Sequence, residues 1–284
     1  MTADARNDQV LKKRISGRPK CGPRLAARDS SSEKQSVGFI CFERNATTAA
    51  LAKRMEFPKR KLGTFYAREF PRFLEPIVPH SEAAFAEDMS TGIRKSFSSI
   101  RKGYQYSTGF SGLEGCTILY IISRKGVYAV HWFENVSFSP DSVWLEGTTV
   151  EDLFQNTVID MLTNGGRYHP KVAARIIEDD YIKAYLIHPT QTWKEGPDDA
   201  GYTEQWQQVR TTVGNLVPKL QDQSRWTDIP YTVATPAEVL KSDGAAGKNL
   251  FKYDPAHDVG GGKTEHLAML WIEDQKEPYH EDRW

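Results

Sequence analysis

Cys116 and His131 are the two residues whose types and spacing could do chemistry together. Cys116 follows Gly115 at the start of an apolar stretch, and His131 comes fifteen residues later. A thiolate attacks carbonyl carbons, and a neighbouring imidazole can take the thiol proton and later protonate a leaving amine. The alternative is a buried cysteine that packs as a small apolar residue, with an ordinary strand histidine nearby.

The residues between the pair read as a β-hairpin, because both halves are β-branched and aromatic around a Lys125-Gly126 turn. A two-residue turn there pairs Tyr120 with His131, which leaves Cys116 on the same face but about 13 Å further along. Catalysis therefore requires a wider or bulged hairpin, or a bend before the first strand. Gly112 and Gly115 are suited to such a bend, since glycine tolerates otherwise forbidden dihedral angles.

This segment resembles the catalytic core of the cytotoxic necrotizing factor toxins and, more distantly, the chemoreceptor glutamine deamidases. Both groups carry a glycine-preceded cysteine and a histidine on a following strand. The Ser-Gly-Cys triplet of the toxins is represented here by Ser111-Gly112 and Gly115-Cys116, with two residues inserted between them. The resemblance covers about 25 to 30 residues, and the cysteine–histidine spacing alone has little specificity.

The resemblance implies a β-sandwich flanked by helices and a cysteine-dependent protein glutamine deamidase that needs no cofactor and no metal. Cys116 would attack the amide carbon, and His131 would protonate the departing ammonia and then activate water against the thioester. The family's third group orients the histidine; Ser111 is the first candidate here and Thr108 the second. The resemblance also implies a protein substrate, such as a small GTPase. A noncatalytic protein-binding or effector module that retains the fold is the alternative.

The rest of the chain predicts an α/β (α+β) fold with a largely antiparallel or mixed sheet flanked by helices. Ser81 and Thr149 are suitable N-caps, and Asn164-Gly165-Gly166 is a suitable helix end. Helices are expected at 46–56, 82–100, 149–163 and 202–220, and further strands at 37–43, 181–189, 229–235, 249–254 and 267–274. The glycine-rich stretch His257–His266 lacks the spacing of a phosphate loop, so we expect a hairpin turn there.

Charge and composition divide the chain into a disordered basic arm, residues 1–36, and a single globular domain, residues 37–284, whose segment 37–80 wraps over the body. Residues 1–80 hold 17 lysines and arginines against 8 acids, although the whole chain has 37 of each. We expect no nucleic-acid binding, because aromatic and basic residues do not alternate in any known pattern. No apolar run approaches the ~20 residues of a transmembrane helix.

Three cysteines without a Cys-x-x-Cys pair predict neither a disulfide framework nor a structural zinc site. Together with the missing apolar centre of a secretory signal, they favour a reduced, intracellular location. A secreted effector is the alternative.

Overall fold

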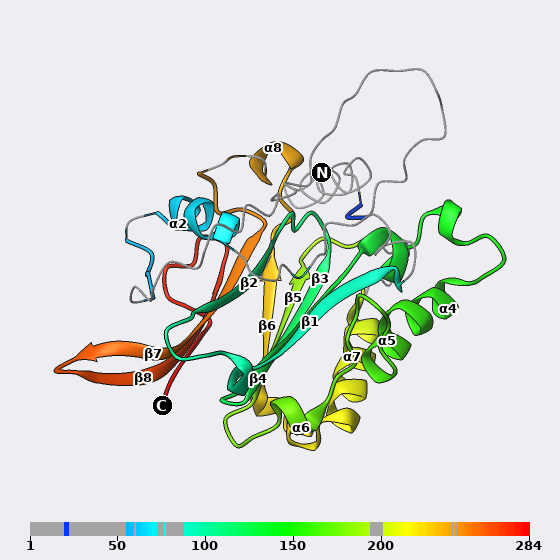
Figure 1. Cartoon of the computed structure of the whole chain (residues 1–284). Helices are drawn as coiled ribbons and strands as arrows, with labels where there is room; N and C mark the ends of the chain where they lie inside the picture. The colour runs from blue at the N-terminus through cyan, green and yellow to red at the C-terminus, as the bar shows by residue number, and fades with distance from the viewer. Residues whose placement is uncertain are drawn as a thin grey trace.

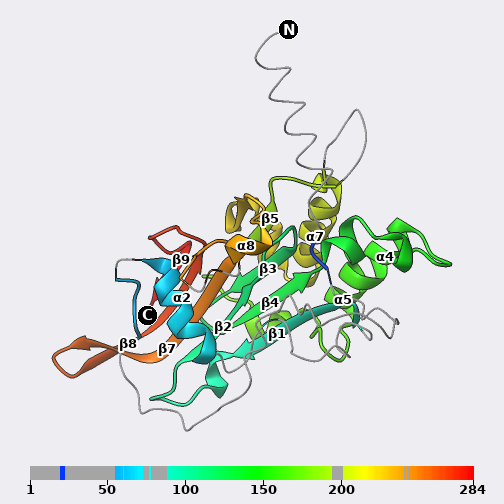
Figure 2. The ribbon, with the colours of Figure 1, turned by 90° about the horizontal axis from the view of Figure 1, so that it is seen from above.

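Two mostly antiparallel β-sheets face each other, and helices cover their outer faces (Figures 1 and 2). The computed structural model describes residues 20–22, 55–59, 61–72, 77, 88–193, 201–239, 241 and 243–284. This arrangement confirms the expected α+β class and sandwich. The strand expected at 37–43 and nearly all of the helix expected at 46–56 lie outside the described residues.

The larger sheet has five strands in the order β1-β4-β3-β5-β6. Its strands are β1 Ser90–Ser96, β3 Thr117–Ile122, β4 Gly126–Trp132, β5 Lys183–Pro189 and β6 Trp226–Tyr231. Only β5 and β6 pair in parallel. The predicted hairpin is thus the centre of this sheet, and the strands expected at 181–189 and 229–235 are present, the second one starting earlier than expected.

The smaller sheet has four strands in the order β2-β7-β8-β9. They are β2 Tyr106–Ser111, β7 Lys248–Gly260, β8 Lys263–Ile272 and β9 His280–Arg283. The turn between β7 and β8 contains Gly260, Gly261 and Gly262, all at positive φ, which confirms the hairpin turn. β2 and β9 were not predicted, because a short strand with serine, glycine or charged residues has little β signal of its own.

Helical segments lie on both outer faces. They are α2 Leu62–Glu69, η1 Phe70–Arg72, η2 Phe97–Ser99, η3 Glu134–Phe138, η4 Ser142–Trp144, α4 Val150–Phe154, η5 Gln155–Ile159, α5 Asp160–Thr163, α6 Ala174–Ile177, α7 Thr203–Leu216, η6 Pro218–Gln221, η7 Gln223–Arg225 and α8 Pro236–Val239. Thr149 caps α4 as expected, since its hydroxyl accepts a hydrogen bond from Asp152 N at 3.0 Å. Within the described ranges, no helix has the length and apolar character needed to cross a membrane.

The helix expected at 82–100 is wrong over residues 90–96, which form strand β1. β1 pairs with β4 along seven residues, from Ser90 opposite Trp132 to Ser96 opposite Gly126. Serine, threonine and glycine are weak helix formers, so the long-range pairing with an apolar central strand decides the local conformation.

Strand alternation sends neighbouring residues of the central hairpin into different cores. On β3, Ile118, Tyr120 and Ile122 belong to the core between the two sheets, whereas Leu119 and Ile121 pack beneath the helices. The two sheets are also joined by a hydrogen bond, since the Tyr120 hydroxyl donates to Asn249 Oδ1 at 2.5 Å. A third apolar cluster joins α2 to the outer face of the smaller sheet.

A buried ion pair accompanies the packing of α2 on the smaller sheet. Lys252 Nζ lies 2.6 Å from Glu69 Oε2, and the two side chains are 4% and 5% exposed. Because the Lys252 ammonium has lost its water, it depends on Glu69 for compensation. Glu69 Oε1 also lies 3.4 Å from Arg68 Nε and 3.6 Å from Arg72 Nη1.

We predict that Glu69→Leu lowers the free energy of unfolding by about 3–5 kcal/mol, because it leaves the Lys252 ammonium buried without its main counter-ion. Urea denaturation measures the effect. Glu56→Gln, a half-exposed partner of Arg68, should cost under ~1 kcal/mol. If the double variant Glu69→Leu/Lys252→Met is no more stable than the single one, the buried pair is not the cause.

Candidate active site

The hairpin register brings Cys116 closer to His131 than the sequence suggested. Ile118, not Tyr120, lies opposite His131, because the turn spans Ser123 to Gly126 and Ser123 N donates to Gly126 O at 3.0 Å. The Ser123 hydroxyl stabilises this wider turn by accepting from Lys125 N at 3.0 Å. Cys116 is therefore two residues from the partner of His131, on the same face, and the expected two-residue turn is wrong.

The chain bends directly before Cys116, as the glycines predicted. Gly112 and Gly115 have φ of 121° and 129°, a region that favours glycine. Gly112 N donates to Gly247 O at 2.9 Å, which ties the bend to the smaller sheet. The Tyr231 hydroxyl accepts from Gly115 N at 3.0 Å and donates to Cys116 O at 2.7 Å. Tyr231 thus fixes the backbone on both sides of the bond that precedes Cys116.

The third member of the site is Cys21, which no sequence spacing suggested. Cys21 and Cys116 form a disulfide with their Cα atoms 5.4 Å apart, so the expectation of unpaired cysteines is wrong for these two. Cys21 Sγ lies 4.0 Å from His131 Nε2. Ligand atoms of Cys21, Cys116 and His131 all lie within 4.8 Å of one another.

His131 lies in an apolar environment between the sheets. Its ring centroid is 4.3 Å from that of Phe110 on β2 and 4.5 Å from that of Phe133. The side chain is fully buried, and this burial lowers its pKa from 6.5 to about 3. The imidazole is therefore neutral near pH 7, which is the form that can accept a proton from a thiol.

Thr91 is the residue that sequence reasoning missed as a partner for this histidine. It lies directly opposite His131 in the β1–β4 ladder, where Cβ atoms on a shared face are about 4.5–5.5 Å apart. Thr91 Oγ1 and His131 Nδ1 are both buried, and neither has a hydrogen-bond partner among the described residues. The sequence analysis missed this strand pairing because it predicted a helix over this segment, and a residue on a helix would not pair with His131 on a strand.

Ser111 and Thr108, the orienting candidates from the sequence, both lie on β2. Phe110 points at His131, so alternation places Ser111 on the opposite face, where it is half-buried. Thr108 shares the face of Phe110 and is fully buried, and its hydroxyl has no partner within the described part of the chain. The described contacts bring Cys116 and His131 together but join Ser111 to neither, and its role stays a prediction.

Two thiols and one imidazole also form a donor set for a soft divalent cation such as Zn²⁺, which binds thiolate sulfur and imidazole nitrogen. A metal needs both sulfurs as thiolates, whereas the disulfide joins them to each other. The same three residues can therefore support a disulfide or a metal, but not both at once.

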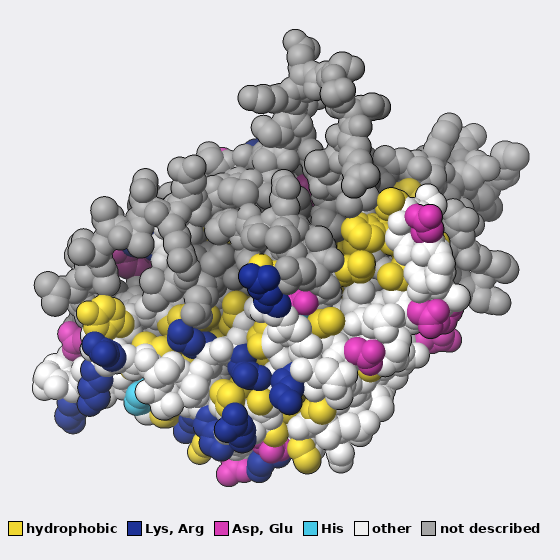
Figure 3. All heavy atoms as spheres, turned by 45° about the vertical axis from the view of Figure 1, so that its right-hand side comes forward, with side chains coloured by type: hydrophobic (Ala, Val, Ile, Leu, Met, Phe, Trp, Pro, Cys, Tyr) yellow, Lys and Arg dark blue, Asp and Glu magenta, His cyan; other side chains and the backbone are white. Residues whose placement is uncertain are grey.

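A groove of about 960 Å³ lies beside the docked segment that contains Cys21. The groove is lined by Lys20, by residues at and directly after the end of η3, by α4 and by the start of α7. Its apolar lining residues include Phe138, Phe154 and Trp193. Three acids, Asp141, Glu151 and Glu204, line it against the single base Lys20. Acidic side chains also lie along the right-hand edge of the face in Figure 3, apart from a group of lysines and arginines at its lower centre.

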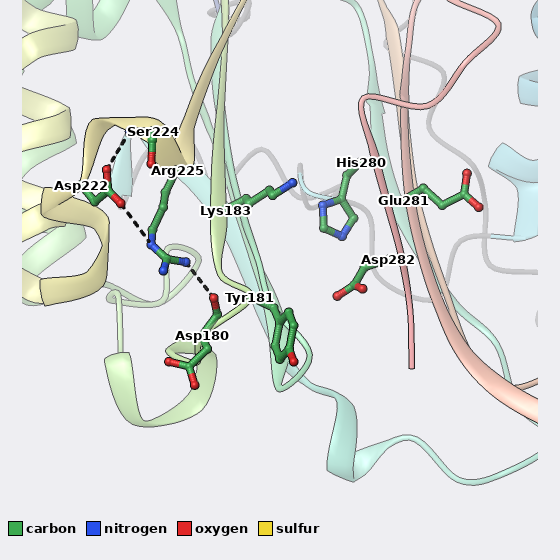
Figure 4. Close-up of a pocket in the computed structure, with 9 residues that line it drawn as sticks. All are labelled: Asp180, Tyr181, Lys183, Asp222, Ser224, Arg225, His280, Glu281 and Asp282. Carbon is green, nitrogen blue, oxygen red and sulfur yellow. Dashed lines mark hydrogen bonds and ion pairs between the residues drawn. The ribbon is translucent and has the colours of Figure 1, made fainter.

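A second, smaller pocket of about 330 Å³ opens near the start of β5 (Figure 4). Lys183 in its wall pairs with Ile122, the last residue of β3, whereas Cys116 precedes the first residue of that strand. Arg225 in its wall pairs with Asp222 at 3.8 Å, and Asp282 pairs with Arg124 at 2.8 Å. These three charged groups of the pocket are therefore already paired.

Comparisons with known proteins place this chain in no family. No family model matches it, and no curated protein sequence matches it significantly. The C-terminal domain of CNFy from Yersinia pseudotuberculosis is similar in structure at 11% identity and a TM-score of 0.27, over 68% of this chain and 57% of that one. The chain therefore spans little more than half of that structure. At this TM-score the structural likeness says nothing about function. Any functional argument therefore rests on the residues of the site.

We predict that the protein loses stability as the pH falls below about 6.5, because burial lowers the pKa of His131 to about 3 and those of His169 and His280 to about 4. The unfolded chain then binds more protons than the folded one, so each histidine costs up to ~1.4 kcal/mol per pH unit. Urea denaturation between about pH 7 and pH 5 measures the slope. His169→Asn should reduce it, whereas an unchanged slope in that variant would mean that His169 is not the buried neutral group described.

Proposed function

We propose that this protein is a cysteine-dependent amidohydrolase of the protein glutamine deamidase type. The observation that carries the proposal is the position of Cys116 and His131 on one face of a rigid hairpin, with their sulfur and nitrogen atoms within 4.8 Å. Proton transfer would need a rotamer adjustment that brings these two atoms within hydrogen-bond reach, about 2.6–3.2 Å in the reactive complex. The geometry suits a nucleophile and its base, and the resemblance around Cys116 favours a glutamine side-chain amide as the substrate.

In this mechanism His131 takes the proton from the Cys116 thiol, and the thiolate attacks the amide carbon of a glutamine side chain. The C–N bond breaks as the imidazolium returns its proton to the departing ammonia, which leaves a thioester on Cys116. His131 then removes a proton from water, the hydroxide attacks the thioester carbon, and glutamate leaves as the thiol reforms.

The developing negative charge on the amide oxygen needs hydrogen-bond donors near the nucleophile. The backbone N–H of Cys116 is the first candidate, with that of Gly115 or Thr117 as the second. Gly115 N–H donates to the Tyr231 hydroxyl in this structure, so its use would require Tyr231 to move. Cys116 must also be reduced before it can act, because the nucleophile is the thiolate and a sulfur in a disulfide cannot form one.

We predict that the reduced protein converts glutamine to glutamate in a target protein, with a mass gain of about one dalton as NH2 is replaced by OH. A panel of small GTPases, read by mass spectrometry of tryptic peptides, is the first screen. Cys116→Ser should lower the rate by roughly 10⁴-fold or more, and Cys41→Ser should leave it unchanged. Equal activity in the Cys116→Ser variant would contradict the mechanism.

Thiol reactivity separates this enzyme from a noncatalytic binding module with the same fold. In the reduced protein, iodoacetamide should alkylate Cys116 with a pH midpoint below the ~8.5 of a free thiol, because transfer of the thiol proton to His131 gives a thiolate paired with an imidazolium. The thiolate charge, which the disulfide lacks, then offsets the burial that keeps His131 neutral in this structure. His131→Phe should raise that midpoint towards the free value. If Cys116 reacts only once the protein is unfolded, the binding module is the better description.

We propose Thr91 as a positioning residue that would hold the His131 ring once the ring turns Nδ1 towards the Thr91 hydroxyl, because neither atom has a hydrogen-bond partner among the described residues in this structure. We predict that Thr91→Val lowers the rate of deamidation by about 10–100-fold, since a ring displaced by about 1 Å loses that much, and shifts the pH midpoint of Cys116 alkylation. Thr91→Ser should restore both. Ser111→Ala is the matched variant, and a larger loss there than in Thr91→Val would make Ser111 the orienting group.

A further inference from the structure

Lys20, Cys21 and Gly22 lie docked against the candidate active site, although they belong to the basic arm. The backbone of Cys21 is held on both sides: its N–H donates to Glu134 Oε2 at 3.4 Å, and its carbonyl accepts from Asn135 N at 3.0 Å. Glu134 is fully buried, and its other oxygen accepts from the Tyr202 hydroxyl at 2.9 Å. The receiving surface is thus built from residues immediately after β4.

The residues on either side of Cys21 are fitted to the same surface. Lys20 Nζ donates to Ser139 O at 2.9 Å and lies 3.2 Å from Asp141 Oδ1. A Cβ at Gly22 would fall 1.8 Å from the side-chain oxygen of Asn135, whose amide donates to Asp141 Oδ2 at 2.9 Å. Only glycine fits there without displacing Asn135.

This docked segment closes the site. Cys116 and His131 are fully buried, and Cys21 is 6% exposed, so no protein substrate can reach the nucleophile in this state. Lys20, the residue before Cys21, lines the groove described above, so departure of residues 20–22 would take Cys21 away from the Cys116 sulfur and remove one wall of that groove.

We propose that Lys20–Gly22 is an intrasteric plug, locked by the Cys21–Cys116 disulfide, and that oxidation and reduction of this bond switch the enzyme off and on. The proposal rests on the proposed function in taking Cys116 as the nucleophile. It assigns the two cysteines as a modification site for a hydroperoxide oxidant and a dithiol reductant.

Oxidation proceeds through the nucleophile itself. The Cys116 thiolate attacks one peroxide oxygen, an S–O bond forms as the O–O bond breaks, and the leaving oxygen departs as water or an alcohol once protonated. The Cys21 thiol then attacks the Cys116 sulfenic acid, so that the S–S bond forms and water leaves. The hydroperoxide is reduced and the two thiols are oxidised.

Reduction begins at the other sulfur. A dithiol attacks Cys21, the more exposed of the pair, and Cys116 leaves as a thiolate that is protonated. The second thiol of the reductant attacks the mixed disulfide, which releases Cys21 and leaves the reductant as a cyclic disulfide. Among the described residues the plug then keeps its hydrogen bonds to the chain after β4 and the ion pair of Lys20 with Asp141. Asp141 is 45% exposed, so that ion pair holds only weakly. Substrate can then displace the segment.

The test uses the full chain with Cys41→Ser, so that Cys21 and Cys116 are the only cysteines. After hydroperoxide and removal of the oxidant, we expect a mass about two daltons lower, one peptide pair cross-linked between Cys21 and Cys116, and iodoacetamide alkylation of Cys116 at least about tenfold slower than after dithiol. Cys21→Ser should remain alkylatable under conditions that close the parent, or go on to higher oxides of Cys116.

Two further variants test the docking itself. Gly22→Ala should slow formation of the cross-link, because the added methyl group displaces Asn135. Lys20→Ala should do so to a smaller extent, with Lys59→Ala, an exposed lysine at a described position away from these contacts, as its matched control. Identical cross-linking rates in all of them would show that residues 20–22 do not dock as described.

The outcomes distinguish the plug from the proposed activity, because alkylation and cross-linking need no substrate. Redox control of alkylation without any gain of mass at glutamine would retain the plug and reject the deamidase. Deamidation that hydroperoxide stops equally in the parent and in Cys21→Ser would retain the enzyme and reject the lock. Release of Cys116 by a metal chelator alone, without a dithiol, would overturn the disulfide in favour of a bound cation.

Discussion

The packing of two sheets face to face is the constraint on which the rest of this structure depends. Because side chains alternate along a strand, the residues of β3 and β4 that share a face with Cys116 must point into the core between the sheets. His131 is thereby held between Phe110 and Phe133 and loses its water. A histidine in such surroundings is held in place by its neighbours and is neutral near pH 7, so its ring can accept a proton.

The same packing restricts access, because a group in the middle of a sandwich cannot be reached through the sheets. Cys116 avoids this only by lying at the end of β3, after the bend at Gly112 and Gly115. Its sulfur is bonded to Cys21, which in turn contacts the chain directly after β4 at this edge of the sandwich. Docking at this edge is the basis on which we propose that three residues act as a plug.

Several buried polar atoms near the site lack partners, unlike most buried polar atoms in proteins. Thr91 Oγ1, Thr108 Oγ1 and His131 Nδ1 all lie between the sheets without a hydrogen bond among the described residues. A buried polar atom that has lost its hydrogen bonds costs about 1–3 kcal/mol, and such costs concentrate at functional sites. The burial of a large apolar core around them offsets this cost, and the unpaired atoms leave His131 able to gain a partner when the ring moves.

The sequence by itself determined the local features: the apolar hairpin, the helix cap at Thr149, the glycine turn after β7 and the α+β class, since each follows from neighbouring residues. It also placed Cys116 and His131 on one face, which needs only the parity of the strand. Only the tertiary structure decided the register that puts Ile118 opposite His131, the strand rather than helix at residues 90–96, and the arrival of Cys21 at the site. These three depend on contacts between segments far apart in the chain, up to 95 residues for Cys21 and Cys116, and local preference contains no information about such contacts.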